Sequence, residues 1–316
     1  MTSPEQSYAA AGVSLATADA IVDRLRVAVA STATPAVAGA FGAFAGLFAI
    51  DERRLLAAST DSVGSKLVLG RRGDRLRWCG SDLAAHCIND VLTTGAEPLF
   101  FLDYVAANTI DVEQVAELIE GAADVCRVAG CAILGGETAE LPGIYREHEI
   151  DFCGTAVGVV DRDRVIDGSR VEEGDLVVGY ASAGIHANGF SLVRKIIGDG
   201  AFDADLLLPP TRLYLEDVRA LRSRADVRAL AHVTGGGIAG NLARVLPAGL
   251  GAIVDPSSWV RPDVFAWLAD NGVAEGELRR VFNIGIGYCA IVPAADTRPG
   301  DLVIGYVVRG EGVSWA

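Results

Sequence analysis

Apolar, strand-like runs alternate with amphipathic helical runs along almost all of the 316 residues. This alternation is typical of an α/β or mixed α+β fold. The clearest helix covers 111–129, where apolar side chains recur on one face and Gly130 follows as a stop signal. Strands are expected over 54–58, 99–105, 131–134, 152–160, 176–181, 227–233, 251–254 and 288–292. Helices are expected over 82–94, 111–129, 189–197, 212–223, 238–246 and 262–271. Ser81 is the expected N-cap of the first of these helices.

The length fits two domains, each large enough to bury a core. The polar, glycine-bearing stretch 161–174 is the best candidate for the boundary between them. We therefore expect an N-terminal domain over 1–165 and a C-terminal domain over 166–316.

The charge balance excludes one class of partner. Lys and Arg total 27 against 41 Asp and Glu, a net charge of −14, which repels a phosphate backbone and argues against a nucleic-acid binder. The six cysteines show no Cys-x-x-Cys pair and no zinc-type spacing. The first five residues have no basic or apolar run typical of a signal peptide. These features favour a cytoplasmic protein with reduced thiols.

One uncharged segment has the length of a membrane span. It runs from Val27 to Ile50, 24 residues. Its side chains are mostly small, however, and Pro35 interrupts it. A buried, glycine-punctuated loop and strand fits this composition better, so no membrane partner is expected.

Three polar motifs in the first half suggest a metal–phosphate site. Asp61 and Lys66 lie in a polar run that follows the strand expected at 54–58. Asp82, His86 and Asp90 occur at i, i+4 and i+8, on one stripe of a helix. The run 135–140 again follows an expected strand and carries two glutamates. Carboxylates from separate elements suit Mg²⁺; alternatively, they are turn residues, caps and a solvated helix face.

Two motifs in the second half could hold an anion. In the first, small residues precede the helix at 189–197. His186 beside them is a candidate acid or base, or a hydrogen-bond donor to a phosphate, or else an ordinary loop histidine. The second, 235–240, matches G-x-G-x-x-G. A dinucleotide fold would leave the carboxylates unexplained, so a glycine turn close to a phosphate is preferred. No Walker P-loop is present.

Longer runs carry a resemblance to a known family. They are CIND at 87–90, GAEPLFFLDY at 95–104, GGETAELPG at 135–143, IDGS at 166–169, HANGFSLVRK at 186–195 and TGGG at 234–237. In this order they resemble phosphoribosylformylglycinamidine cyclo-ligases, also called aminoimidazole ribonucleotide synthetases. The resemblance extends from about Tyr8 to about Val292. It implies ATP-dependent closure of formylglycinamidine ribonucleotide to aminoimidazole ribonucleotide in purine biosynthesis, by a two-domain homodimer with a β-barrel interface.

The resemblance also implies roles for single residues. Mg²⁺ would be bound by Asp61, Asp90 and Glu137. ATP would contact Asp61, Gly64, Lys66, Asn89, Asp90, Gly135, Gly136, Glu137 and Thr138. The ribonucleotide would contact Gly184, His186, Asn188, Ser191, Thr234, Gly235 and Gly236. The catalytic candidates are His186, His232 and Lys66, with His186 preferred for proton transfer because it opens a helix.

Departures from the family pattern matter at three positions, one of which is Ala9, where the family has a lysine. His86 stands where the family has an apolar residue, so we do not expect it to be a ligand, and Arg26 stands where the family has a lysine linked to ATP. The alternatives are a related phosphotransferase, similar to thiamine-phosphate kinase or selenophosphate synthetase, or a non-catalytic nucleotide-binding module.

Overall fold

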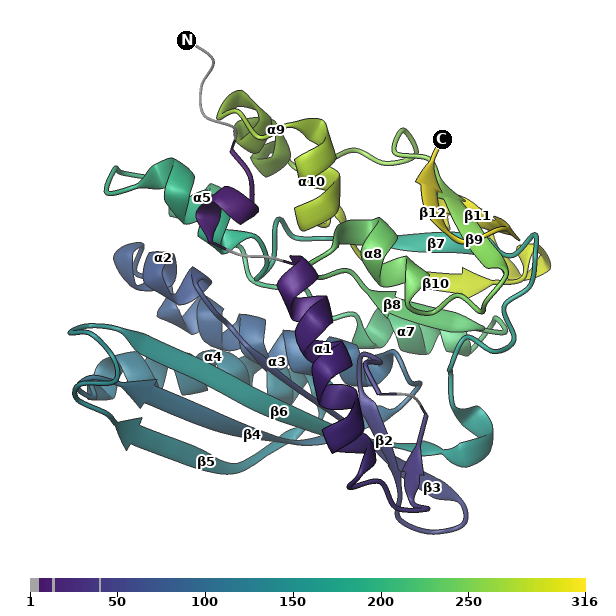
Figure 1. Cartoon of the computed structure of the whole chain (residues 1–316), viewed down its shortest axis with the longest axis horizontal. Helices are drawn as coiled ribbons and strands as arrows, with labels where there is room; N and C mark the ends of the chain where they lie inside the picture. The colour runs from purple at the N-terminus through teal and green to yellow at the C-terminus, as the bar shows by residue number, and fades with distance from the viewer. Residues whose placement is uncertain (1–5, 13–14, 40) are drawn as a thin grey trace.

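The computed structural model describes residues 6–12, 15–39 and 41–316, so the first five residues, which carry the signal-peptide prediction, lie outside it. Two six-stranded sheets, each with its own helices, lie side by side (Figure 1). This arrangement confirms the mixed α/β class. The last strand of the first sheet ends at Asp161 and the first strand of the second begins at Leu176. The proposed boundary at 165/166 falls in the segment between them.

The first sheet has the order β1-β2-β3-β6-β4-β5. Its strands are β1 Val37–Ala38, β2 Gly46–Ala49, β3 Arg54–Ser62, β4 Glu97–Ala107, β5 Ala132–Glu140 and β6 Ile150–Asp161. Only β4 and β5 pair in parallel. Helices α3 (Leu76–Leu92) and α4 (Val112–Ala129) cover one face, behind the sheet in Figure 1. The opposite face leaves Leu99, Leu102 and Leu134 exposed.

The second sheet has the order β12-β9-β11-β7-β10-β8, and only β12 and β9 are parallel. Its strands are β7 Leu176–Ala181, β8 Ala229–His232, β9 Leu250–Val254, β10 Ile286–Val292, β11 Val303–Arg309 and β12 Gly312–Trp315. The remaining helices are α1 Leu15–Ala30, α2 Lys66–Arg72, α5 Phe190–Ile197, α6 Ala204–Leu207, α7 Leu215–Arg222, α8 Gly237–Ala243, α9 Asp263–Asp270 and α10 Glu275–Val281, with 3₁₀ turns at Ala9–Ala11, Arg162–Arg164 and Ala294–Asp296.

The ends of α4 are set by capping residues, whereas the start of α3 is not. Asp111 caps α4 by accepting from the backbone N–H groups of Glu113 and Gln114, and Gly130 ends it with φ 67°. The predicted helix 111–129 is thus confirmed. Helix α3 begins at Leu76, so the prediction of Ser81 as its N-cap is wrong; the Ser81 hydroxyl donates instead to the Gly121 carbonyl of α4 at 3.1 Å.

The strands that carry the first-half motifs are longer than predicted. β3 continues to Ser62 and β5 to Glu140. Asp61 and Glu137 therefore lie within strands, not in loops after them. The face of the sheet on which each side chain lies then follows from strand register.

The uncharged segment is not one element. α1 ends at Ala30, and the described residues after it form turns, bends and the short strands β1 and β2. Of the described residues in this segment only Phe44 and Ala45 are buried, so the prediction of a buried loop and strand is wrong. Among the described residues, no helix is both long and apolar enough to cross a membrane. All six cysteines are free, and all but Cys153 are buried.

Candidate active site

The polar stripe of α3 lies in the interior, between the two halves. Asp82, His86 and Asp90 are all buried, with at most 9% of each exposed. They lie on one side of α3 because they are spaced at i, i+4 and i+8. Each forms an ion pair or a hydrogen bond with a side chain from another helix or strand. The interpretation as a solvated helix face is therefore wrong, and His86, which we had set aside, belongs to this cluster.

Asp90 joins the two halves. Its Oδ1 lies 2.8 Å from Nδ1 of His232 on β8, and its Oδ2 accepts from the Ser59 hydroxyl on β3 at 3.0 Å. His86 Nε2 lies 3.3 Å from Asp61 Oδ2, and the His86 and His232 rings stack edge to face at 4.7 Å. We refer to Asp61, His86, Asp90 and His232 as the histidine–aspartate cluster.

Burial sets the charges in this cluster. It raises the pKa of Asp90 to about 6, while it lowers the pKa of His232 to about 3 and that of His86 below its usual range. Near pH 7 both rings are therefore neutral and Asp90 is mostly ionised. A neutral His232 donates through Nδ1 to this carboxylate, which leaves Nε2 as an acceptor. Nε2 is buried and has no partner among the described residues.

The glycine turn follows His232 directly. The Asn241 amide nitrogen donates to the carbonyls of Thr234 (3.2 Å), Gly235 (3.2 Å) and Gly237 (2.8 Å), which fixes the shape of the turn. A Cβ at Gly237 would lie 2.1 Å from the Arg279 carbonyl, so no larger residue fits there.

The segment around His186 meets this turn. A Cβ built at Gly235 would lie 3.6 Å from Asn188 Oδ1, so two of the predicted substrate motifs lie together. The Ser191 hydroxyl lies 3.2 Å from that of Ser65, which connects α5 to the motif at 59–66. Gly64, which precedes Ser65 in this motif, has a left-handed backbone with φ 63°.

His186 itself is turned inward. Its Nε2 accepts from the Ala183 N–H at 3.2 Å, and its ring is buried. Burial lowers its pKa well below the usual value. Gly184 accepts from the Asn283 amide at 2.8 Å. Nδ1 of His186 is also buried without a partner among the described residues, but it carries the proton because Nε2 accepts. Of the two predicted proton-transfer candidates, His232 therefore has the better geometry for accepting a proton, because a carboxylate orients its ring and its second nitrogen is an unused acceptor.

Lys66 is fully buried and its ammonium group is saturated. Nζ lies 2.7 Å from Asp82 Oδ2 and donates to the carbonyls of His186 (2.8 Å) and Pro209 (3.1 Å). An ammonium has three protons, and all three are used here. This placement favours a positioning role for Lys66 over contact with a triphosphate.

Asn89 is likewise held by the protein. Its Oδ1 accepts from the Tyr214 N–H at 3.0 Å and its amide donates to the Arg212 carbonyl at 2.8 Å. The backbone carbonyl of Asn89 accepts from the Tyr288 hydroxyl at 3.1 Å. Asn89 therefore fixes α3 against the start of α7, one residue from Asp90.

The three predicted metal ligands do not converge. Register aligns Asp61 with Gly154, Asp103 and Gly136 across β3, β6, β4 and β5. Glu137 is one residue further along β5, so it lies on the opposite face from Asp61 and three strand spacings away. Among the described residues, no three His, Cys, Asp or Glu side chains form a group that could hold a metal ion. Within one chain Glu137 therefore does not lie beside Asp61, and the assignment of Asp61, Asp90 and Glu137 to Mg²⁺ stays a prediction.

The remaining predicted ATP residues lie on the edge strand. Gly135, Gly136, Glu137 and Thr138 are all exposed on β5. They are separated from the histidine–aspartate cluster by the two strands that lie between β5 and β3.

Two residues near the cluster were missed from the sequence. Asp103, on the same sheet face as Asp61, is half-buried, and burial raises its pKa. Arg244, just after α8, lines a cavity of about 190 Å³ together with Thr93, Thr94 and Asp167. Asp103 lies in the resembling run 95–104, so the motif contained a signal; Arg244 had none beyond its position ten residues after Thr234.

The comparisons with known proteins decide the family. Two models match, described as AIR synthase related protein, N-terminal domain over residues 42–160, and C-terminal domain over residues 172–313. A phosphoribosylformylglycinamidine cyclo-ligase from Anaeromyxobacter dehalogenans is 46% identical over 307 residues, covering 92% of this chain and 89% of the relative. The chain belongs to this family. A cyclo-ligase of the same description from Burkholderia cenocepacia is 45% identical over 304 residues, covering 92% and 87%.

Solved structures show the same fold at low sequence identity. A thiamine monophosphate kinase from Aquifex aeolicus has a TM-score of 0.63 and 17% identity, covering 96% of this chain and 98% of that one. The hydrogenase maturation protein HypE has a TM-score of 0.61 and 22% identity, covering 80% of each chain. At these identities the likeness concerns the fold alone.

Proposed function

We propose that the chain closes the imidazole ring of aminoimidazole ribonucleotide from formylglycinamidine ribonucleotide, with ATP converted to ADP and phosphate. Family membership makes it a ligase of purine biosynthesis that uses ATP. The identity of 46% over 92% of the chain carries this proposal. A cytoplasmic location is consistent with that role.

The chemistry explains what the site must do. An amide oxygen is a poor leaving group, so the formyl oxygen first takes the terminal phosphoryl group of ATP and ADP is released. The amidine nitrogen of the substrate then attacks the formyl carbon, and phosphate leaves with the former formyl oxygen. Holding the two ends of the substrate together lowers the barrier by several kcal/mol, on the order of what a well-oriented intramolecular reaction gains.

The contacts around His232 support a place for it in this reaction. The attacking nitrogen must lose a proton, and the buried, unpartnered Nε2 can accept it. The Asp90 carboxylate stabilises the imidazolium that forms. The glycine turn follows His232 in sequence, and Asn188 lies beside Gly235 of this turn. Together they would hold the ribonucleotide.

Mg²⁺ enters this proposal together with the ATP substrate, and Asp61, Asp90 and Glu137 stay its proposed ligands, although Glu137 does not lie beside Asp61 within one chain. Asp61 is the half-exposed acidic group of the cluster and would face the nucleotide. We keep Gly64 and Gly135–Thr138 as proposed ATP contacts.

We further propose a homodimer that pairs the outer faces of the two first sheets. Leu99, Leu102 and Leu134 are 42%, 41% and 64% exposed on that face. Apolar residues grouped on an uncovered sheet face are typical of an interface. Glu137 and the edge strand β5 would then lie at or near the interface.

A substrate comparison tests the activity. The chain is incubated with Mg·ATP and either formylglycinamidine ribonucleotide or thiamine monophosphate, and ADP and the aminoimidazole product are measured. We expect one ADP per aminoimidazole and no reaction with thiamine monophosphate. Phosphorylation of thiamine monophosphate would favour the kinase alternative, and ATP binding without turnover would favour a non-catalytic module.

A further inference from the structure

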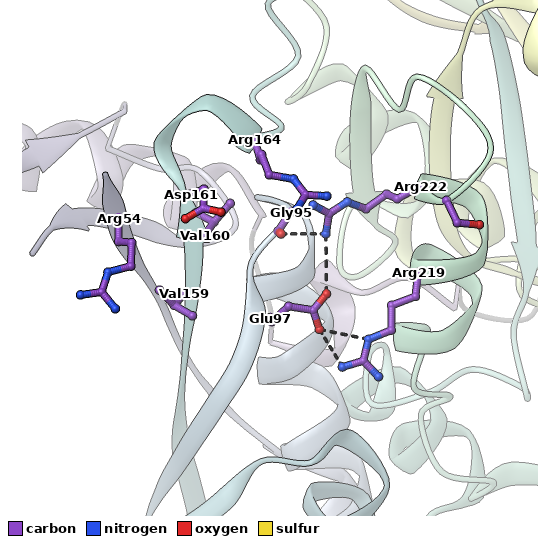
Figure 2. A pocket seen from close by; sticks show the side chains of 10 residues that line it. Arg54, Gly95, Glu97, Val159, Val160, Asp161, Arg164, Arg219 and Arg222 are labelled. Atoms are coloured by element: carbon purple, nitrogen blue, oxygen red, sulfur yellow. Dashed lines mark hydrogen bonds and ion pairs between the residues drawn. The ribbon is translucent and has the colours of Figure 1, made fainter. Parts of the chain in front are cut away.

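A pocket lined by several charged side chains lies between the two halves, away from the histidine–aspartate cluster. Its volume is about 410 Å³ (Figure 2). The first sheet supplies Arg54 and Asp161, the turn before β4 and its first residue supply Gly95 and Glu97, and the connecting segment supplies Arg164. Helix α7 of the second half adds Arg219 and Arg222. Four guanidinium groups thus face two carboxylates, in a chain whose net charge is −14.

The two carboxylates do not neutralise all four cations. Glu97 is engaged by Arg219, whose Nε and Nη2 donate to its Oε2 at 3.0 and 2.7 Å. Arg54 is engaged by Asp51 through two hydrogen bonds. Arg222 donates from Nη1 to the Gly95 carbonyl at 2.8 Å, and the same nitrogen is 3.8 Å from Glu97.

The remaining donors belong to Arg164 and Arg222. Among the described residues, Arg164 has no hydrogen-bond or ion-pair partner, and Arg222 uses only Nη1. Figure 2 shows the two guanidinium groups pointing toward each other beside Gly95. The Arg222 side chain is only 18% exposed. Burial lowers the pKa of Arg222, the nearby Glu97 carboxylate raises it, and the charge of Arg164 lowers it again, with a lowered pKa as the net result.

Arg222 is mostly buried and Arg164 is exposed beside it, so their like charges repel each other, and an anion between them would relieve that repulsion. The planar guanidinium fork matches a phosphoryl group, which can accept two bonds from each arginine. The apolar lining comes from Val159, Val160 and aliphatic stems and includes no aromatic ring, so charge rather than stacking would govern recognition.

We propose that this pocket is a binding site for a phosphate-bearing small molecule, whose phosphoryl group lies between Arg164 and Arg222. It is separate from the proposed active site. The two ends of α7 lie at different sites. Tyr214, the residue before α7, donates its backbone N–H to Asn89 near the cluster, whereas Arg222, the last residue of α7, lies at the pocket. The eight residues of α7 span roughly 12 Å. A bound phosphate would connect α7 to the segment that links the two halves.

Calorimetric titration with inorganic pyrophosphate tests the proposal on the full chain and two variants. Arg164→Gln removes one side of the proposed clamp. Arg162→Gln is the matched control, because Arg162 is in the same short helix, is exposed, and donates to the Glu52 carbonyl without lining the pocket. We expect the wild-type chain and Arg162→Gln to bind pyrophosphate at this site alike, and Arg164→Gln to bind it at least tenfold more weakly. Equal binding by all three would overturn the proposal.

A third variant and a crystal soak locate the anion. Asp161→Asn removes a carboxylate from the lining and should tighten pyrophosphate binding. Crystals soaked in tungstate should show an anomalous peak between Arg164 and Arg222. A peak at the glycine turn alone would show that the anion binds only at the active site, and the proposal would fail.

Discussion

Asp90 and His232 are 142 residues apart in sequence, and their side chains meet at 2.8 Å across the junction of the two halves. One is on a helix that covers the first sheet and the other on the edge strand of the second. The pair therefore exists only when both halves have folded and docked. It also fixes which nitrogen of His232 carries the proton and which one is left as an acceptor.

Replacing His232 by Asn should remove the proposed base while keeping a polar side chain of similar size. We expect kcat for aminoimidazole formation to fall by a factor of about 100 to 10,000, the usual contribution of a positioned general base. The KM for ATP should change little. The control is His148→Asn. The side chain of His148 is 72% exposed, and its replacement should leave kcat unchanged. A His232→Asn variant with normal kcat would show that another group takes the proton.

The pH dependence of kcat should report Asp90. Only the ionised carboxylate stabilises a protonated His232, and burial raises the pKa of Asp90 to about 6. As the pH falls through 6, Asp90 takes up a proton and kcat should decline, about tenfold for each further pH unit. In Asp90→Asn, kcat should be low and should lose this acidic limb. The same limb in wild type and Asp90→Asn would assign it to a different group.

Lys66 should matter for stability more than for ATP binding. Lys66→Met leaves the buried Asp82 carboxylate without its cation, which should lower the free energy of unfolding by about 3–5 kcal/mol. Urea denaturation measures the change. Lys195 is the chain's only other lysine and is exposed, so Lys195→Met should change stability by less than about 0.5 kcal/mol. If Lys66→Met folds normally but raises the KM for ATP, the ammonium contacts the nucleotide after all.

The sequence predicted what depends on local chemistry. Helix α4 was placed within one residue because its cap and its αL glycine are adjacent to the periodic run. The meeting of the glycine turn with the segment at 186–191 was expected from the family resemblance. These features depend on residues close in sequence or on long motifs.

The remaining features depend on tertiary contacts that residue types do not reveal. Lys66 was expected to face a triphosphate, but Asp82 is its partner, and this carboxylate was counted among the polar residues of a metal–phosphate site. Glu137 was expected beside Asp61, but strand register places it on the other face of the sheet. His86 looked like a departure from the family pattern, yet it packs between Asp61 and His232.

The outer face of the first sheet should control oligomeric state. Leu134→Glu places a charge on the most exposed of the three leucines there, and burying it against a partner would be costly. We expect the wild-type chain to sediment as a dimer and Leu134→Glu as a monomer. Val260→Glu alters a surface residue of the second half that is 94% exposed, and it should remain dimeric. A monomeric wild-type chain would contradict the proposed interface.

The fate of the formyl oxygen tests the proposed reaction most directly. Substrate carrying ¹⁸O in its formyl group is converted with unlabelled ATP in unlabelled water, and the released phosphate is analysed by mass spectrometry. If the formyl oxygen is phosphorylated before the ring closes, each phosphate carries one ¹⁸O and equals the aminoimidazole product in amount. Unlabelled phosphate, formed by attack of water on ATP, would contradict this account.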